Sequence, residues 1–298
     1  MQNQKTPSPK SHLFGFGFGY SAHALAARLA GTHWRIQGTT RNPTTPGNEN
    51  NIPLLPFDGN APLADADRHL ADVTHLLLSV PPDASGDPVL RHHEKNFAAS
   101  AKLRWIGYLS TTGVYGDHGG DWVDEETPLR PTTPRSEWRA AAEKAWLAFG
   151  AAHGLPVHIF RLAGIYGPGR NALDAIRAGR ARRICKPGQV FSRIHVADLA
   201  ATLHRSMDAP RDGRIYNVCD DRPAPPQDVI AFAAKLLGAT PPPEIAFKDA
   251  ALSEMARSFY ADNKRVANTR IKQELGVTLR YPDYEAGLKA LFATLPTG

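Results

Sequence analysis

The stretch Leu13–His23, LFGFGFGYSAH, is the feature that most constrains the fold of this 298-residue chain. A short apolar run leads into it, and small and apolar residues at helical spacing follow it from Ser21 to Ala30, so the pattern predicts a strand, a tight turn and a helix. In such a unit the glycines let a pyrophosphate approach the backbone, and the helix N-terminus offers free N–H groups. The alternative is a strand end that is merely rich in glycine.

The phosphate-binding pattern, Gly-x-Gly-x-x followed by a small residue, can be placed on this stretch in two registers. A start at Gly15 places Tyr20 at the third position, where only a small residue lets the helix pack against the strand. A start at Gly17 places alanine there, so this register is favoured and Gly15 belongs to the strand. The expected cofactor-binding turn comprises Gly17, Phe18, Gly19, Tyr20 and Ala22.

The end of the next apolar run, GTTR at 38–41, bears on the choice of dinucleotide. A site for NAD usually has a carboxylate at this point to bind the ribose hydroxyls. Here Thr40 and Arg41 stand instead, and the planar guanidinium suits a phosphate group. The sequence therefore favours NADP over NAD as the cofactor, the alternative being that Arg41 is a solvated loop residue.

Further apolar runs, in which polar residues do not alternate with apolar ones, indicate a parallel sheet buried on both faces. They alternate with helical patterns, of which the longest runs from about Arg135 to Ala152, so the fold class is α/β, a Rossmann-type doubly wound parallel sheet. The runs are Leu13–Phe16, Trp34–Thr39, Ile52–Leu55, the segment ending at Val80, Arg104–Ser110 and Leu155–Leu162.

Composition excludes several functional classes. The two cysteines form no CxxC pair, so neither a zinc site nor a disulfide framework is expected. No apolar run is long enough to span a membrane, and residues 1–12 are polar and lack the apolar core of a signal peptide, so we expect a disordered leader and a cytoplasmic protein. The net charge of +6 fits solubility or a small anionic ligand; no nucleic-acid-binding motif is present.

Three motifs carry a resemblance to a known family: STTGVYG at Ser110–Gly116, RLAGIYGPGR at Arg161–Arg170 and RIHVADLA at Arg193–Ala200. With them the chain resembles, from about Leu13 to Asp221, the NAD(P)-dependent epimerase/dehydratase family of the extended and atypical short-chain dehydrogenase/reductases. The resemblance implies an NAD(P)-binding Rossmann domain over 13–168, continued by 193–220. It also implies a small C-terminal substrate-binding lobe over 169–192 and 221–298, and a homodimer formed through long helices.

The same resemblance implies further site residues. Thr111 would hydrogen-bond the reacting oxygen of the substrate, with Thr112 beside it. The implied cofactor contacts are Asp58 facing the adenine, Ser79, Val80 and Pro81 after the fourth strand, and Leu162, Gly164 and Tyr166 in the loop beside the nicotinamide.

The substrate site is expected to be lined by basic residues. A segment rich in arginine and lysine begins at Arg170 and runs to Lys186. It is either a solvated face or part of a pocket for an anionic substrate. Arg193 and His195 would border the substrate by resemblance, although His195 can equally be a structural histidine.

The chain departs from the family where its members carry Tyr-x-x-x-Lys. Aligning RSEWR with that motif places Arg135 at the tyrosine position and Arg139 at the lysine position, four residues apart on one helix face. Arginine does not release a proton near neutral pH. Arg139 could still hold the ribose and Arg135 could stabilise an oxyanion. Tyr115 and Tyr166 are candidate substitute acids, the alternative being that both rings serve packing.

Two functions remain open at this point. The first is an NAD(P)-dependent oxidoreductase or epimerase of altered mechanism, acting on a small-molecule substrate that is anionic or a nucleotide sugar. The second is a catalytically inactive NADP(H)-binding sensor or scaffold. Neither requires a metal, nucleic acid or membrane.

Overall fold

The computed structural model describes residues 11–31, 33–42 and 52–295. Most of the expected leader lies outside these ranges. Its last two residues, Ser11 and His12, are ordered as the first residues of strand β1, so the sheet begins earlier than the sequence suggested.

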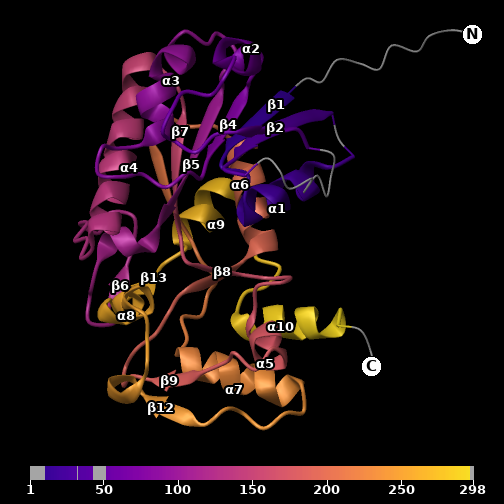
Figure 1. The fold of residues 1–298 in the computed structure, drawn as a ribbon, viewed down its shortest axis with the longest axis vertical. Helices are drawn as coiled ribbons and strands as arrows, with labels where there is room; N and C mark the ends of the chain where they lie inside the picture. Colours follow the sequence, from indigo (N-terminus) through magenta and orange to yellow (C-terminus); the bar gives the residue numbers. More distant parts are fainter. Residues whose placement is uncertain (1–10, 32, 43–51, 296–298) are drawn as a thin grey trace, which may run out of the picture. The chain divides into compact units, whose positions relative to one another are not determined.

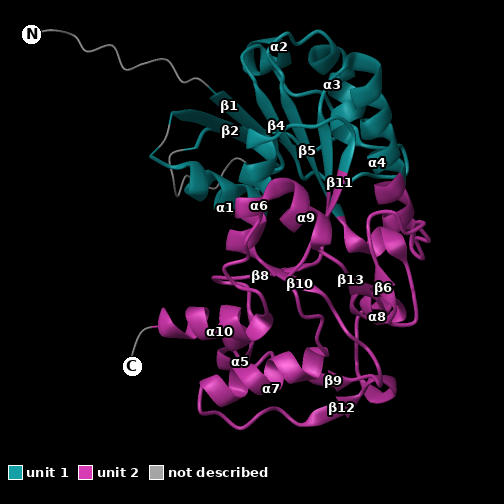
Figure 2. Ribbon diagram, turned by 180° about the vertical axis from the view of Figure 1, so that it is seen from behind, with its two compact units in different colours: residues 1–110, 141–159, 203–214 teal, residues 111–140, 160–202, 215–298 magenta. Residues whose placement is uncertain are grey.

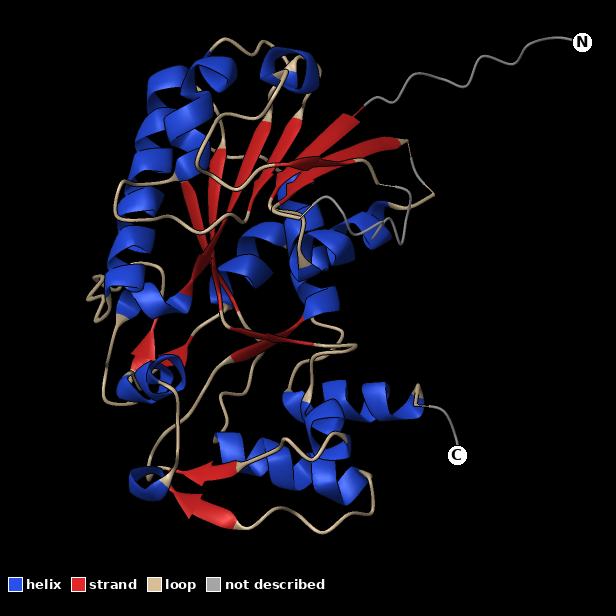
Figure 3. Cartoon of the chain, in the orientation of Figure 1, coloured by secondary structure: helices blue, strands red, loops and turns tan. Residues whose placement is uncertain are grey.

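A seven-stranded parallel sheet forms the centre of the Rossmann fold, in the order β11-β7-β5-β4-β1-β2-β3 (Figures 1 and 3). The chain starts in the middle of the sheet, runs to one edge and then crosses to build the other half, which confirms the doubly wound topology. The strands are β1 (Ser11–Phe16), β2 (Trp34–Thr40), β3 (Leu54–Pro56), β4 (His75–Leu78), β5 (Trp105–Thr111), β7 (Val157–Leu162) and β11 (Arg214–Val218).

Helices cover both faces of this sheet (Figure 1). On one face the ring of Phe16 lies 6.2 Å from that of Phe97 in α3, and Phe97 lies 6.0 Å from Trp146 in α4. On the other face the Trp105 indole donates a hydrogen bond of 3.1 Å to Ser206 in α6. The helices are α1 (Tyr20–Leu29), α2 (Ala66–Leu70), α3 (Pro88–Ala98), α4 (Pro134–His153) and α6 (Val196–Asp208).

The chain divides into two compact units, coloured separately in Figure 2. The first takes in the described parts of 1–110 together with 141–159 and 203–214; the second takes in 111–140, 160–202 and the described part of 215–298. The segment 111–140, which begins at the last residue of β5, groups with the C-terminal part of the chain, and the expected domain bounds stay a prediction.

The second unit consists of short elements. Its small strands pair in parallel as β6 (Trp122–Val123) with β13 (Arg265–Val266), β8 (Gly164–Tyr166) with β10 (Arg193–His195), and β9 (Arg183–Cys185) with β12 (Glu244–Ala246). Its helical elements are η1 (Thr112–Tyr115), α5 (Ala172–Arg177), α7 (Pro226–Leu236), η2 (Phe247–Asp249), α8 (Glu254–Ala261), α9 (Thr269–Leu275) and α10 (Tyr284–Ala293). None of the helices within the described ranges is both long and apolar enough to cross a membrane.

Candidate functional site

The turn between β1 and α1 requires glycine at position 17. The φ angle of Gly17 is +80°, and a Cβ atom there would lie 2.8 Å from Ser79 Oγ. Ser79 Oγ donates a hydrogen bond to the carbonyl of Gly17, and the N–H of Gly17 donates one of 2.9 Å to Thr39 Oγ1. Side chains of β2 and of the segment after β4 therefore fix the turn from both sides.

Phe18 stabilises the turn through a backbone hydrogen bond and through its ring. Its N–H donates a 2.7 Å hydrogen bond to the carbonyl of Thr39, and its side chain is buried. The ring lies over Gly38 and Gly15, since a Cβ on Gly38 would come within 2.3 Å of Phe18 Cδ2. The backbone and the packing of Phe18 therefore stabilise the turn, and its contact with the cofactor stays a prediction.

The N-terminus of α1 is open to a ligand. Gly19 is the N-cap and provides no side-chain cap, and no acidic residue stands in the first turn. Apart from the adjoining residues, no described atom lies within 4 Å of the place that a Cβ of Gly19 would take. The backbone N–H donors and the positive end of a ten-residue helix suit a phosphate. Ala22 is buried where the helix meets the strand, as the favoured register requires.

A cavity of about 480 Å³ in the first unit extends from this turn. It brings together the sequence-predicted residues Gly17, Phe18, Gly19, Thr40, Arg41, Asp58, Ser79, Val80 and Pro81. The backbone N–H and the side-chain amide of Asn60 donate hydrogen bonds of 2.9 and 2.8 Å to the Asp58 carboxylate and lower its pKa, so Asp58 stays ionised at neutral pH. The pattern of glycines, an open helix end and polar strand ends fits a dinucleotide.

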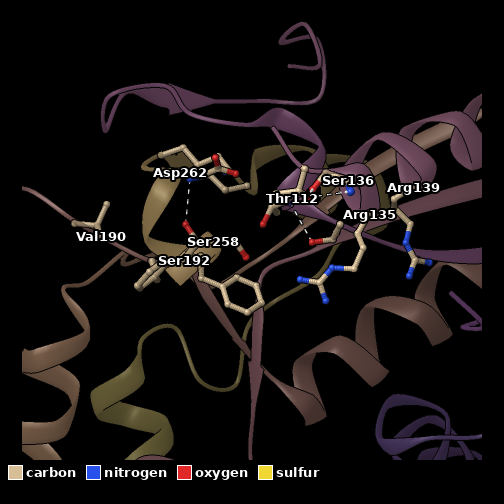
Figure 4. Close-up of a pocket in the computed structure, with 15 residues that line it drawn as sticks. Thr112, Arg135, Ser136, Arg139, Val190, Ser192, Ser258 and Asp262 are labelled. Carbon is tan, nitrogen blue, oxygen red and sulfur yellow. Dashed lines mark hydrogen bonds and ion pairs between the residues drawn. The ribbon is translucent and has the colours of Figure 1, made fainter. Parts of the chain in front are cut away.

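A second cavity, of about 290 Å³, lies within the second unit. Figure 4 shows Arg135 and Arg139 projecting from α4 with Thr112 and Ser136 close by. The cavity thus brings together four sequence-predicted site residues: Thr111, Thr112, Arg135 and Arg139.

Hydroxyl groups form much of the wall beside the arginines. Thr111 Oγ1 accepts a 3.1 Å hydrogen bond from the N–H of Gly113, which starts η1. Thr133 Oγ1 donates a 3.0 Å bond to Ser136 Oγ at the beginning of α4. These contacts fix the side chains at the cavity wall next to two cationic groups.

Several residues of this cavity were missed by sequence reasoning. They come from two later segments and comprise Val190, Phe191, Ser192, Ser258, Phe259, Asp262, Lys264 and Val266. The side chain of Lys264 is buried, and its Nζ donates a 2.6 Å hydrogen bond to the carbonyl of Gly116. No motif marks these positions; most of them lie beyond the part of the chain that carries the resemblance.

Comparisons with known proteins agree with this architecture. The model of the NAD dependent epimerase/dehydratase family matches residues 96–219. Protein YeeZ of Escherichia coli K12 is 30% identical over 283 residues, which cover 90% of this chain and 95% of YeeZ. The chain belongs to the NAD-dependent epimerase/dehydratase family.

Solved structures share the family fold. A conserved protein of unknown function from Silicibacter pomeroyi DSS is 53% identical, with a TM-score of 0.86 over 95% of this chain and 99% of that one. A dTDP-glucose 4,6-dehydratase from Bacillus anthracis, solved with NAD, has a TM-score of 0.73 over 95% and 96% of the two chains. At 18% identity that likeness concerns the fold alone.

Tyr115, a candidate substitute for the tyrosine of the family, lies in the interior of the second unit. It is fully buried, its hydroxyl donates a 2.7 Å hydrogen bond to Asn217 Oδ1, and it accepts one of 2.9 Å from the Arg161 guanidinium. Burial raises the pKa of Tyr115 to about 12. Tyr115 does not line the second cavity, so its contacts favour the alternative that the ring serves packing.

Tyr166 and His195 also belong to the interior of the second unit. The Tyr166 hydroxyl donates to the carbonyl of Asp283 at 3.3 Å, and burial raises its pKa. His195 packs edge-on against Tyr166 at 5.2 Å and accepts a 3.2 Å hydrogen bond from the N–H of Ala197. Burial lowers the pKa of His195 to about 4, so the ring is neutral. Neither side chain lines the two cavities described above, and their roles beside the cofactor and the substrate stay predictions.

The basic residues expected around the substrate are mostly bound to the protein itself. Arg193 donates hydrogen bonds of 2.8 and 3.0 Å to the carbonyls of Phe191 and Ala224. Arg183 pairs with Glu244 at 2.8 Å. Arg170 is exposed in a turn and, like Leu162 and Gly164, lines neither cavity described above. Of the arginines predicted as site residues, Arg135 and Arg139 line the second cavity.

Proposed function

We propose that this chain is an NADP-dependent oxidoreductase of the epimerase/dehydratase family that acts on a small anionic carbonyl compound or the corresponding alcohol. The observation that carries the proposal is the gathering of two guanidinium groups and the Thr111 and Thr112 hydroxyls in one cavity. Guanidinium groups bind carboxylate or phosphate oxygens, and the hydroxyls can hold the reacting oxygen.

The size of the cavity favours a small substrate. At about 290 Å³ it lies at the lower end of the range for small-molecule sites. A dTDP-glucose 4,6-dehydratase from Streptomyces griseus is 27% identical over 179 residues, so a nucleotide sugar remains the alternative substrate class. The expected cytoplasmic location and homodimer stay part of this proposal.

The first-unit cavity supports the cofactor assignment. The turn at Gly17 and the open end of α1 would hold the pyrophosphate, and Arg41 at the end of β2 would pair with a 2′-phosphate. When bound, the nicotinamide supplies or accepts a hydrogen with two electrons. Arg135 would stabilise negative charge on the substrate, and Thr111 would orient the reacting oxygen.

A redox assay tests the proposal. The purified chain is mixed with NADPH and a panel of 2-keto acids, phosphorylated ketones and nucleotide sugars, and NADPH oxidation is followed by absorbance. We expect turnover of a small anionic ketone and a loss of about tenfold or more in kcat/KM for Arg135→Ala, since an ionic hydrogen bond contributes about 1.5–3 kcal/mol. Arg68→Ala, an exposed arginine of the first unit, is the control and should change nothing.

A non-enzymatic sensor is the second candidate, because no tyrosine stands among the described residues that line the second cavity. Tight NADPH binding without turnover of any compound in the panel would favour the sensor and contradict the oxidoreductase.

A further inference from the structure

Reduction of a carbonyl group requires a proton donor. The tyrosine that serves as donor in the family is absent from the described residues that line the second cavity. Arg135 and Arg139 occupy the tyrosine and lysine positions, and guanidinium groups retain their protons near neutral pH. Serine and threonine hydroxyls are weaker acids still. Among the described residues that line the cavity, the ionisable groups other than the arginines are Asp262 and Lys264.

Lys264 is held in a defined position at this cavity. Its Nζ donates a 2.6 Å hydrogen bond to the carbonyl of Gly116 and lies 3.4 Å from Asp262 Oδ2. Position 116 requires glycine, because its φ is +71° and a Cβ there would collide with the carbonyl of Arg130. An ammonium group has three N–H donors. The described residues engage two, which leaves one for a substrate oxygen.

Asp262 is suited to steady this ammonium group. Its Oδ1 accepts a 2.8 Å hydrogen bond from Thr132 Oγ1, while its Oδ2 faces Lys264. Both side chains are largely shielded, with exposed fractions of 10% for Lys264 and 14% for Asp262. The electrostatic interaction between a shielded ion pair and a charged ligand is stronger than that of a solvated pair, because less water screens it.

The surroundings of Lys264 favour proton exchange. Burial lowers its pKa, and the nearby carboxylates oppose this effect only in part. The carboxylates that act on Lys264 are Asp262 and Asp117, and Arg135 and Arg139 line the same cavity.

We propose that Lys264, steadied by Asp262, donates the proton to the substrate oxygen in this cavity in place of the tyrosine of the family. The step rests on the proposed function. The carbonyl carbon gains a hydrogen and two electrons from NADPH, while the Lys264 N–H bond breaks and an O–H bond forms at the carbonyl oxygen. The neutral amine then regains its proton from water, and oxidation of an alcohol runs the same transfers in reverse.

Amine labelling of the full chain tests whether Lys264 can act in this way without any turnover. Trace acetic anhydride is applied across a pH series, and acetylation of each lysine is read by mass spectrometry. We expect Lys264 to become reactive at lower pH than the exposed Lys248. Oxalate, a small dianion, should slow its labelling about fivefold in the wild type and not in Arg135→Ala. A Lys264 that reacts only after denaturation in urea would be a structural cation, and the proposal would be overturned.

Substitution tests the catalytic role. Lys264→Arg keeps the cation and the donors but cannot release a proton. For a ketone turned over by the wild type, kcat should fall about 100-fold, with the Kd for NADPH unchanged. Lys248→Arg is the matched control. The wild-type reduction rate should decline as pH rises through the pKa of Lys264, because the ammonium form is consumed.

The two proposals fail in different ways. If the wild type turns over no compound in the panel, the proposed function is wrong and this step falls with it. If turnover is present and Lys264→Arg stays within about threefold of the wild type, the proton donor lies elsewhere while the oxidoreductase function stands.

Discussion

The two cavities are built on different principles. The first-unit cavity combines one contiguous backbone turn, from Gly17 to the N-terminus of α1, with side chains from nearby strand ends. The second-unit cavity presents side chains from four separate stretches, at 111–113, 133–139, 190–192 and 258–266 (Figure 4). Recognition by backbone depends on local conformation, whereas recognition by side chains depends on how distant segments pack.

The largest expected effect comes from breaking the backbone turn. Gly17→Ala forces a Cβ to 2.8 Å from Ser79 Oγ at a positive φ, so we expect a loss of about 1–3 kcal/mol in stability and of measurable NADPH binding. Thermal unfolding and calorimetric titration would record the two losses.

Gly19→Ala is the matched control for stability. Its Cβ meets no described atom within 4 Å outside the adjoining residues, so folding should be unaffected. The added methyl group stands where a phosphate would approach, so NADPH should bind about tenfold more weakly. Wild-type affinity in Gly19→Ala would contradict a phosphate site at this helix end.

A smaller effect is expected from the side chain that distinguishes the two dinucleotides. Arg41→Asp should weaken NADPH binding about 30-fold, because it replaces an ionic hydrogen bond by repulsion of the 2′-phosphate. NADH binding should stay nearly constant, and Arg68→Asp should alter neither. Equal losses for both dinucleotides would refute the NADP assignment.

The smallest effect on activity is expected in the polar interior of the second unit. Tyr115→Phe removes the hydroxyl that joins Asn217 and Arg161. Stability against urea should fall by about 1–2 kcal/mol, while kcat changes by no more than about threefold. A large loss of kcat at unchanged stability would return Tyr115 to the role of proton donor.

Much of the first unit could be predicted from the sequence because its signals are local. Buried parallel strands appear as unbroken apolar runs, and the turn predicted to bind phosphate is contiguous from Gly17 to Ala22. Strands β6, β12 and β13 have two or three residues each. These strands are too short to show a periodic pattern of apolar residues, so only their pairing with another strand identifies them.

The second cavity could be predicted only in part. Thr111 and the arginine pair were singled out through their motifs. Lys264 lies beyond the resemblance, and its Nζ is held by a hydrogen bond to the carbonyl of Gly116, which is remote in sequence. The motifs also placed Tyr115 and His195 near the site without fixing the direction of their side chains. That direction depends on remote partners such as Asn217.

The packing of Phe18 has a practical consequence for redesign of the cofactor preference. Its ring fills the space over Gly15 and Gly38, and its N–H engages Thr39, so the framework of the turn is separate from the positions that would read the ribose. A mutant library aimed at NADH use can therefore randomise Thr40 and Arg41 freely. Phe18, Gly38 and Thr39 should be held constant, because most changes there would yield unfolded clones instead of altered specificity.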